Sequence, residues 1–243
     1  MSRVSVLLAA SIVFVSLLSV SPAVAKTLFE DNFSAGMGKW EIIGPGEADI
    51  KTDNSAPAGY GPDVLFMTEA ASGSDLMAFA RGVVVTDGFY ELLWNDVGLP
   101  EDTDGPIWLR GQDEQSGPNT GNGYLVELDT DTGLHIGVIK NATEGPTFTS
   151  PAAEMSSGDW TWMKVRFEGP SIQVKIWIAG EAEPGTWNLE AEDASFTEGT
   201  IGLRCWSGTA HMAYIRISDL EGPAPGDVEP QAKIAATWGK IKL

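Results

Sequence analysis

The sequence predicts an all-β protein, built as an antiparallel two-sheet sandwich of the jelly-roll type. Hydrophobic and polar residues alternate along many short segments, which is the period of a strand that buries one of its faces. Segments rich in Gly, Pro, Asp and Ser separate these strands, and no long segment carries a helical hydrophobic stripe. A single flat sheet would leave its apolar face in water, so we expect two sheets packed face to face.

Two hairpins are the clearest elements of this prediction. Segment 172–178 alternates Ile or Val with Gln, Lys and Trp, and it follows the alternating segment 162–167 across the turn residues 168–171. Segments 124–129 and 133–140 repeat this arrangement around a Thr-Asp-Thr turn. Further strands are expected at 76–85, 89–96, 107–112, 200–206 and 212–220.

The composition is that of a folded, acidic domain. Of 243 residues, 43% are hydrophobic and 20% are charged, which allows the chain to bury a core. The 34 Asp and Glu residues outnumber the 15 Lys and Arg residues, and the formal net charge of -19 repels phosphate backbones. We therefore expect no nucleic-acid partner. The single cysteine excludes an internal disulfide and a cysteine-rich zinc site.

Residues 1–25 have the pattern of a secretory signal peptide. Arg3 precedes the apolar run 4–20, and Ala23 and Ala25 supply the small residues of a cleavage site. Cleavage near Ala25 predicts a secreted, periplasmic or cell-surface protein whose mature chain has no membrane span. An uncleaved N-terminal anchor is the alternative.

One domain is expected in the mature chain. It covers residues 26–221, and a Pro- and Gly-containing linker with a short basic tail follows over 222–243. Export of a chain with so little cysteine points to a bacterial source.

Five segments follow one another at the spacing of a known superfamily. They are LFEDNFSAGMGKW near the start, IWLRGQD with NGYLVELD in the centre, WTWMKVRFEG, and YIRISDLEG near the end. Together they resemble the concanavalin A-like, laminin G-like jelly-roll superfamily, over about residues 28–221. The resemblance implies a saccharide ligand, because members bind or cleave glycans. Secreted bacterial relatives include carbohydrate-binding modules and the 3-keto-disaccharide hydrolase group.

Aromatic and arginine side chains on polar strand faces indicate a glycan platform. Trp177 shares a face with the polar residues of its strand, and the face opposite Ile107 and Leu109 carries both Trp and Arg. Sugar rings pack their C–H patches on aromatic rings, while guanidinium groups donate paired hydrogen bonds to sugar oxygens. The expected ligand-binding residues, with Glu127 as an acceptor, are Trp108, Arg110, Glu127, Trp177, Arg204 and Trp206. In the alternative arrangement, loops cover the tryptophans and the arginines form structural ion pairs.

Catalytic signatures are mostly missing. The Glu-x-Asp-x-x-Glu strand signature of similar laminarinase-type glucanases does not occur, and the nearest pair, Glu127 and Asp129, lacks a third acid in register. His135, on the polar side of its strand, is a further candidate acid or base. The leading hypothesis is therefore noncovalent carbohydrate binding. A hydrolase of glycosidic bonds that uses Glu127, Asp129 or His135 is the runner-up, and an adhesion or matrix protein that binds another protein is the third hypothesis.

The resemblance also implies a structural calcium ion. Similar proteins often bind calcium where the first and last strands meet, and the matching positions are Asp31 and Asp219. The acidic composition supplies the hard oxygen ligands that calcium requires. In the alternative interpretation, Asp219 only terminates its strand.

Overall fold

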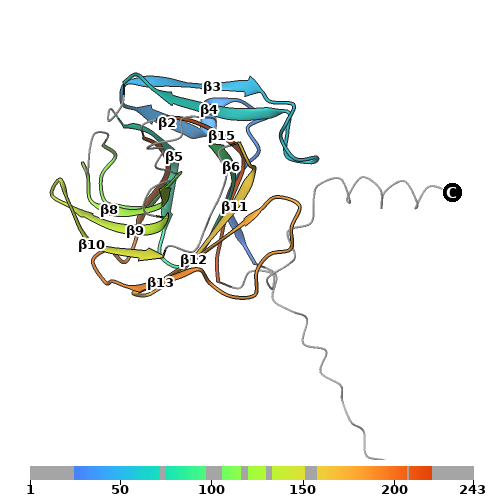
Figure 1. Cartoon of the computed structure of the whole chain (residues 1–243). Helices are drawn as coiled ribbons and strands as arrows, with labels where there is room; N and C mark the ends of the chain where they lie inside the picture. Colours follow the sequence, from blue (N-terminus) through green and yellow to red (C-terminus); the bar gives the residue numbers. More distant parts are fainter. Residues whose placement is uncertain are drawn as a thin grey trace, which may run out of the picture.

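The chain forms two antiparallel sheets that pack face to face (Figure 1). The computed structural model describes residues 25–71, 75–96, 106–115, 120–129, 133–150, 158–206 and 208–220. This architecture confirms the predicted two-sheet sandwich. The predicted signal peptide, except for Ala25, and the linker and tail lie outside the described residues.

Within the described residues, the larger sheet, here called sheet A, has eight strands. Its order is β13 (Leu189–Glu192), β12 (Ser171–Ile178), β11 (Thr161–Glu168), β6 (Gly88–Asp96), β15 (Thr209–Ser218), β4 (Asp63–Glu69) and β3 (Gly46–Thr52), with β1 (Thr27–Asp31) also paired to β15. Sheet B has the order β10 (Thr143–Ser150), β9 (Gly133–Lys140), β8 (Gly123–Asp129), β7 (Pro106–Gly111), β14 (Gly199–Cys205), β5 (Leu76–Val85) and β2 (Trp40–Ile43). A short 3-10 helix, η1 (Met37–Lys39), precedes β2.

Both predicted hairpins are confirmed. Strands β11 and β12 pair in antiparallel register, with Trp162 opposite Trp177. Strands β8 and β9 also pair in antiparallel register, with Glu127 opposite His135. The edge strands β3 and β10 were not predicted, because none of their residues is fully buried and each strand has only one or two apolar residues that pack on the core, Ala48 and Ile50 in β3 and Phe148 in β10.

The main core lies between the sheets and takes residues from both. Alternate residues such as Met163, Val165 and Phe167 of β11 point into it and are fully buried. The hydroxyl of Tyr90 on β6 donates a 2.9 Å hydrogen bond to the carbonyl of Gly202 on β14, which joins the two sheets across the core.

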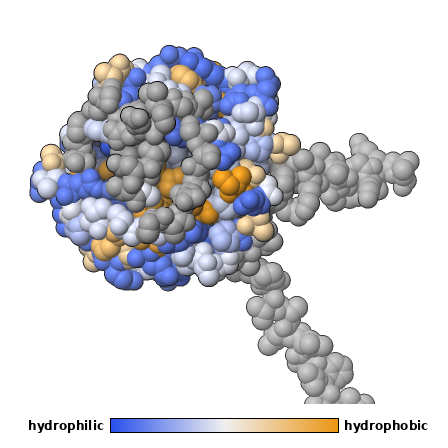
Figure 2. All heavy atoms as spheres, viewed as in Figure 1, coloured by the Kyte–Doolittle hydropathy of each residue, from blue (hydrophilic) through white to orange (hydrophobic). Residues whose placement is uncertain are grey.

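Each sheet also carries a smaller hydrophobic cluster on its outer face. The cluster on sheet A contains Tyr60, Leu93, Trp160, Trp162 and Tyr214, and the cluster on sheet B contains Met77, Phe79, Trp108, Leu125 and Ile139. The rest of the visible surface is mainly hydrophilic, as Figure 2 shows. In the part of the chain that is described, no helix has the length and hydropathy needed to cross a bilayer.

Candidate functional site

The residues predicted to bind a ligand lie in three different places. Trp108, Glu127, Arg204 and Trp206 belong to sheet B or follow it directly. Trp177 packs with the aromatic cluster on the outer face of sheet A, and Arg110 points into the interior. The structure therefore does not form the single platform that the sequence analysis expected.

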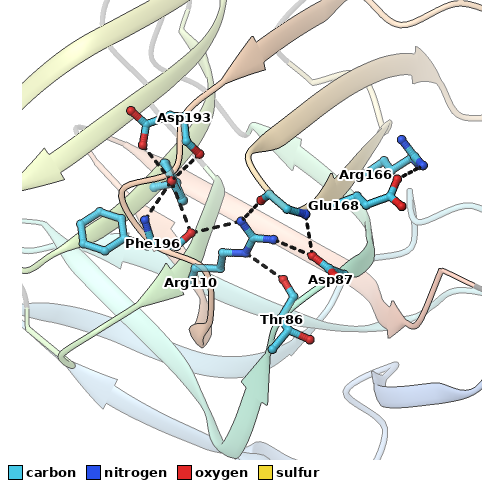
Figure 3. A network of polar contacts seen from close by, with 9 residues as sticks. Thr86, Asp87, Arg110, Arg166, Glu168, Asp193 and Phe196 are labelled. Carbon is cyan, nitrogen blue, oxygen red and sulfur yellow. Dashed lines mark hydrogen bonds and ion pairs between the residues drawn. The ribbon is translucent and has the colours of Figure 1, made fainter.

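Arg110 does not share a face with Trp108, which corrects the sequence analysis. Its φ of 50° lies in the left-handed region and breaks the alternation of β7. The fully buried guanidinium donates to the carbonyl oxygens of Thr86 (2.8 Å), Gly169 (2.8 Å) and Phe196 (3.1 Å), and to the Asp87 carboxylate (3.1 Å; Figure 3). Arg110 is thus a structural residue that ties three loops together.

A row of polar side chains crosses the outer face of sheet B. Pro106 of β7 pairs with Glu127 of β8, and Glu127 pairs with His135 of β9. On the other side of β7, the pairing of Leu203 with Ile107 brings Arg204 next to Pro106. Because residues in register share a face, Arg204, Glu127 and His135 come from three strands to one surface.

Arg204 is the centre of this row. Its Nε donates a 2.9 Å hydrogen bond to Oδ1 of Asp75, and its Nη1 donates to Oε1 of Glu127. The three side chains are between 4% and 7% exposed, so solvent screens their interactions weakly. The half-buried ring of Trp206 covers the guanidinium, with 4.8 Å between the Arg204 Cζ and the ring centroid.

A second polar contact extends the row toward the edge of sheet B. The His135 Nε2 lies 2.7 Å from Oε1 of Glu144, and Gly137 leaves room for this contact, because a Cβ there would lie 2.5 Å from that oxygen and 3.0 Å from Nε2. The hydrogen bond with His135 lowers the pKa of Glu144, and the charge of Arg204 acts in the same direction. We refer to these residues together as the Arg204 site: Asp75, Glu127, His135, Glu144, Arg204 and Trp206.

Asp75 and Glu144 were missed by the sequence analysis. Asp75 precedes β5 and lies 129 positions from its partner Arg204, and Glu144 belongs to the unpredicted edge strand β10. The contact of Asp75 depends on how distant strands pair, and the contact of Glu144 with His135, nine positions away, depends on the unpredicted pairing of β10 with β9.

Trp108 is a packing residue in this structure, in agreement with the alternative interpretation. The side chain is 3% exposed, and its indole lies against the backbone of Gly111 and Gly123. A Cβ at either glycine would overlap the ring. Asp129 ends β8, and its side chain lies outside the described residues.

The predicted calcium ligands do not meet. The Asp31 carboxylate accepts hydrogen bonds from the Phe33 amide (3.1 Å) and the Trp40 indole (2.8 Å) at one end of β1. The Asp219 carboxylate accepts from the Lys26 amide (3.0 Å) at the other end. No group of three His, Cys, Asp or Glu side chains suited to a metal ion occurs in the described ranges. The residues therefore do not fit the calcium ion that the resemblance implied.

Known proteins resemble the chain in sequence and in fold. No family model matches it. It is 25% identical over 197 residues to a levanase of Bacillus sp. (strain L7), a match that covers 79% of this chain but 18% of the levanase. The carbohydrate-binding module CBM66 from Bacillus subtilis superimposes with a TM-score of 0.52 at 17% identity, over 74% of this chain and 94% of the module.

A Bacillus subtilis protein with a galectin-like fold superimposes with a TM-score of 0.60 at 12% identity, over 80% of this chain and 98% of that protein. The solved structures establish the fold: the chain is a concanavalin A-like jelly-roll sandwich. The chain spans less than a fifth of the levanase that it matches.

The Arg204 site combines three kinds of group that complement a polyhydroxylated molecule. The carboxylates of Asp75 and Glu127 supply hydrogen-bond acceptors, and the guanidinium of Arg204 supplies donors. The half-buried Trp206 offers part of an aromatic ring beside them. A few convergent polar groups next to an aromatic surface are typical of small-molecule and sugar sites.

Proposed function

We propose that this domain binds carbohydrate noncovalently through the Arg204 site. The observation that carries the proposal is the buried Arg204 guanidinium, placed between the carboxylates of Asp75 and Glu127 and beneath the Trp206 ring. Sugar hydroxyls both donate and accept hydrogen bonds, so they match a site that presents carboxylates and a guanidinium together. The ring of Trp206 then contacts the C–H face of the sugar.

The comparisons support this ligand class. CBM66, 94% of which is covered by the superposition, is named as a carbohydrate-binding module. The Bacillus levanase is named for levan, a polymer of fructose. Levan and its oligosaccharides are therefore the first ligands to test. We also propose that the protein acts outside the cytoplasm, which the signal-peptide pattern of residues 1–25 supports.

Replacing the aromatic side of the site tests the proposal. We expect Trp206→Ala to raise the Kd for levan oligosaccharides by about tenfold or more, which corresponds to a loss of about 1.4 kcal/mol of binding free energy. Isothermal titration calorimetry measures this change. The matched control is Trp187→Ala, because Trp187 is also half-buried and also covers a cation, with 4.7 Å between the Lys175 Nζ and its ring centroid. Trp187 lies over sheet A, so its removal should leave this affinity unchanged. Equal affinities of wild type and Trp206→Ala would contradict the proposal.

A reducing-sugar assay on the purified protein distinguishes binding from hydrolysis. Noncovalent binding predicts that wild-type protein releases no reducing sugar from levan. Sugar release that disappears in Glu127→Gln would overturn the proposal in favour of a glycosidic hydrolase, because that substitution keeps the side-chain shape but removes the acid.

A further inference from the structure

A pocket lies on the outer face of sheet A, on the side of the sandwich opposite the Arg204 site. Its volume is 540 Å³, which is within the range of small-ligand sites. The lining consists of Trp162, Trp177 and the segment 179–183, with three residues of the 53–62 loop: Pro57, Ala58 and Tyr60. None of these residues belongs to the Arg204 site.

Three aromatic rings form the floor and one wall of this pocket. Trp162 and Trp177 are cross-strand partners, and their rings are nearly parallel, with an interplanar angle of 17° and 6.0 Å between centroids. The Tyr60 ring stands against Trp162 at 81°, with 5.2 Å between centroids. Trp162 and Tyr60 are buried, whereas Trp177 is half-buried and opens the floor to solvent.

The wall is held in place before any ligand arrives. Asp53 at the start of the 53–62 loop contacts His211 of β15, with 2.7 Å between the carboxylate oxygen and Nδ1. The indole of Trp160 donates a 3.1 Å hydrogen bond to the Ser55 hydroxyl in the same loop. A preformed wall lowers the conformational entropy that a ligand must offset.

The polar side of the pocket is the carboxylate of Glu183, which forms ion pairs with lysines. The Glu183 side chain is 6% exposed, and its Oε1 lies 2.5 Å from the Lys175 Nζ and 3.4 Å from the Lys164 Nζ. Burial raises the pKa of Glu183, but the hydrogen bond and charge of Lys175 and the charge of Lys164 outweigh burial and lower it. The carboxylate therefore stays ionised as an acceptor, and its charge is offset by Lys175 and by Lys164, which also lies 3.0 Å from Oε1 of Glu91.

This charge balance decides which ligand fits. A quaternary ammonium site requires aromatic rings around a cation and gains from uncompensated negative charge. Here Trp162 and Trp177 stack on each other instead of surrounding a common centre, and the buried Glu183 pairs with Lys175 and shares Lys164 with Glu91. A neutral ring with a flat C–H face and several hydroxyls fits both features, because it packs on the indoles and donates to Glu183.

We propose that this pocket is a second glycan site, which takes one neutral glycosyl unit on the face opposite the Arg204 site. The ligand class rests on the proposed function, but the residues are separate. A domain with sugar sites on both outer faces binds two segments of polysaccharide at once. It therefore links neighbouring chains, or gains avidity along one flexible chain.

Binding stoichiometry tests this proposal. We expect isothermal titration calorimetry with levan oligosaccharides to give two sites in wild type, one in Trp177→Ala, one in Trp206→Ala and none in the double variant. The control Val84→Ala should keep two, since Val84 is 62% exposed on β5 and does not line the pocket. In the Trp206→Ala background, the indole Nε1–H resonance of Trp177 should shift on titration, and melting temperatures verify that each variant is folded.

The outcomes separate the two proposals. One site in wild type that Trp206→Ala removes and Trp177→Ala leaves intact overturns the second site alone. One site that Trp177→Ala removes and Trp206→Ala leaves intact overturns the Arg204 site alone. Failure of wild type to bind any neutral oligosaccharide in a panel of fructans, mannans and glucans overturns both. Perturbation of Trp177 by choline or by a peptide, without perturbation by sugars, also overturns the second site.

Discussion

At the scale of single residues, two buried arginines have different surroundings. Arg110 directs its donors at three backbone carbonyls and one carboxylate, so every contact is made to the protein itself. Arg204 lies between two carboxylates and under a half-buried indole. The first arrangement stabilises the fold, and the second is the one that we propose for ligand recognition.

Arg110 therefore offers a clear prediction for stability. Arg110→Ala leaves the carbonyls of Thr86, Gly169 and Phe196 without a buried donor, and we expect the free energy of unfolding to fall by about 3 kcal/mol or more. Urea denaturation followed by circular dichroism measures the change. The control is Arg81→Ala, because the Arg81 side chain is 54% exposed and its ion pair with Glu41 contributes less than about 1 kcal/mol. Equal denaturation midpoints for the two variants would refute this role.

At the scale of elements, the Asp53 carboxylate helps to hold the 53–62 loop to sheet A. The Asp53 carboxylate contacts the Ser55 amide (2.8 Å), the Ser55 hydroxyl (2.6 Å) and the His211 ring (2.7 Å). Burial raises the pKa of Asp53, but the hydrogen bonds and the charge of His211 outweigh burial and lower it below the ordinary 3.8. The charged carboxylate is thus more stable in the folded protein than in the unfolded chain.

The direction of the pH effect follows from linkage. The contribution of Asp53 to stability is fully present above the unfolded pKa of 3.8 and is lost as the pH falls through the lower folded pKa. We expect wild type to melt at a higher temperature than Asp53→Asn at pH 6, and the difference to shrink below pH 3.8. Ser55→Ala removes one donor and should give an intermediate pH dependence. A difference that is constant from pH 6 to pH 2.5 would contradict the prediction.

At the scale of the whole molecule, the two sheets depend on one core. Tyr90 bonds across it from β6 to β14, and Arg110 of β7 joins the β5–β6 and β11–β12 turns through Asp87 and Gly169. Neither sheet can cover its inner face without the other. Unfolding should therefore involve both sheets together.

Paired core variants test this cooperativity. Ile215→Ala in sheet A and Ile136→Ala in sheet B each remove a fully buried side chain, and each should lower the free energy of unfolding by about 2–5 kcal/mol. Tryptophan fluorescence and far-UV circular dichroism should report one shared transition in wild type and in both variants. Two separate transitions, or a variant that shifts only one spectroscopic signal, would show that the sheets unfold independently.

The prediction of the fold succeeded where local patterns carry the information. Alternation with turn residues identified β8, β9, β11 and β12, because each buries one face and leaves a regular period in the sequence. The edge strands β3 and β10 escaped detection because neither has a consistently buried face. Trp108 lies on its expected outer face, but Gly111 and Gly123 bring its ring flat against the backbone and bury it.

The sequence by itself determined the two-sheet sandwich and the strand face on which Arg204, Glu127 and Trp177 lie. Tertiary structure alone decided that Trp177 and Trp206 belong to opposite sides, that Asp75 meets Arg204, and that Arg110 turns inward at a positive φ. Alternation is a local signal that separates the two faces of one strand. The arrangement of the strands in the sheets assigns each face to one side of the sandwich. It also brings together partners that are far apart in the sequence, such as Arg204 with Glu127, 77 positions away, and with Asp75, 129 positions away.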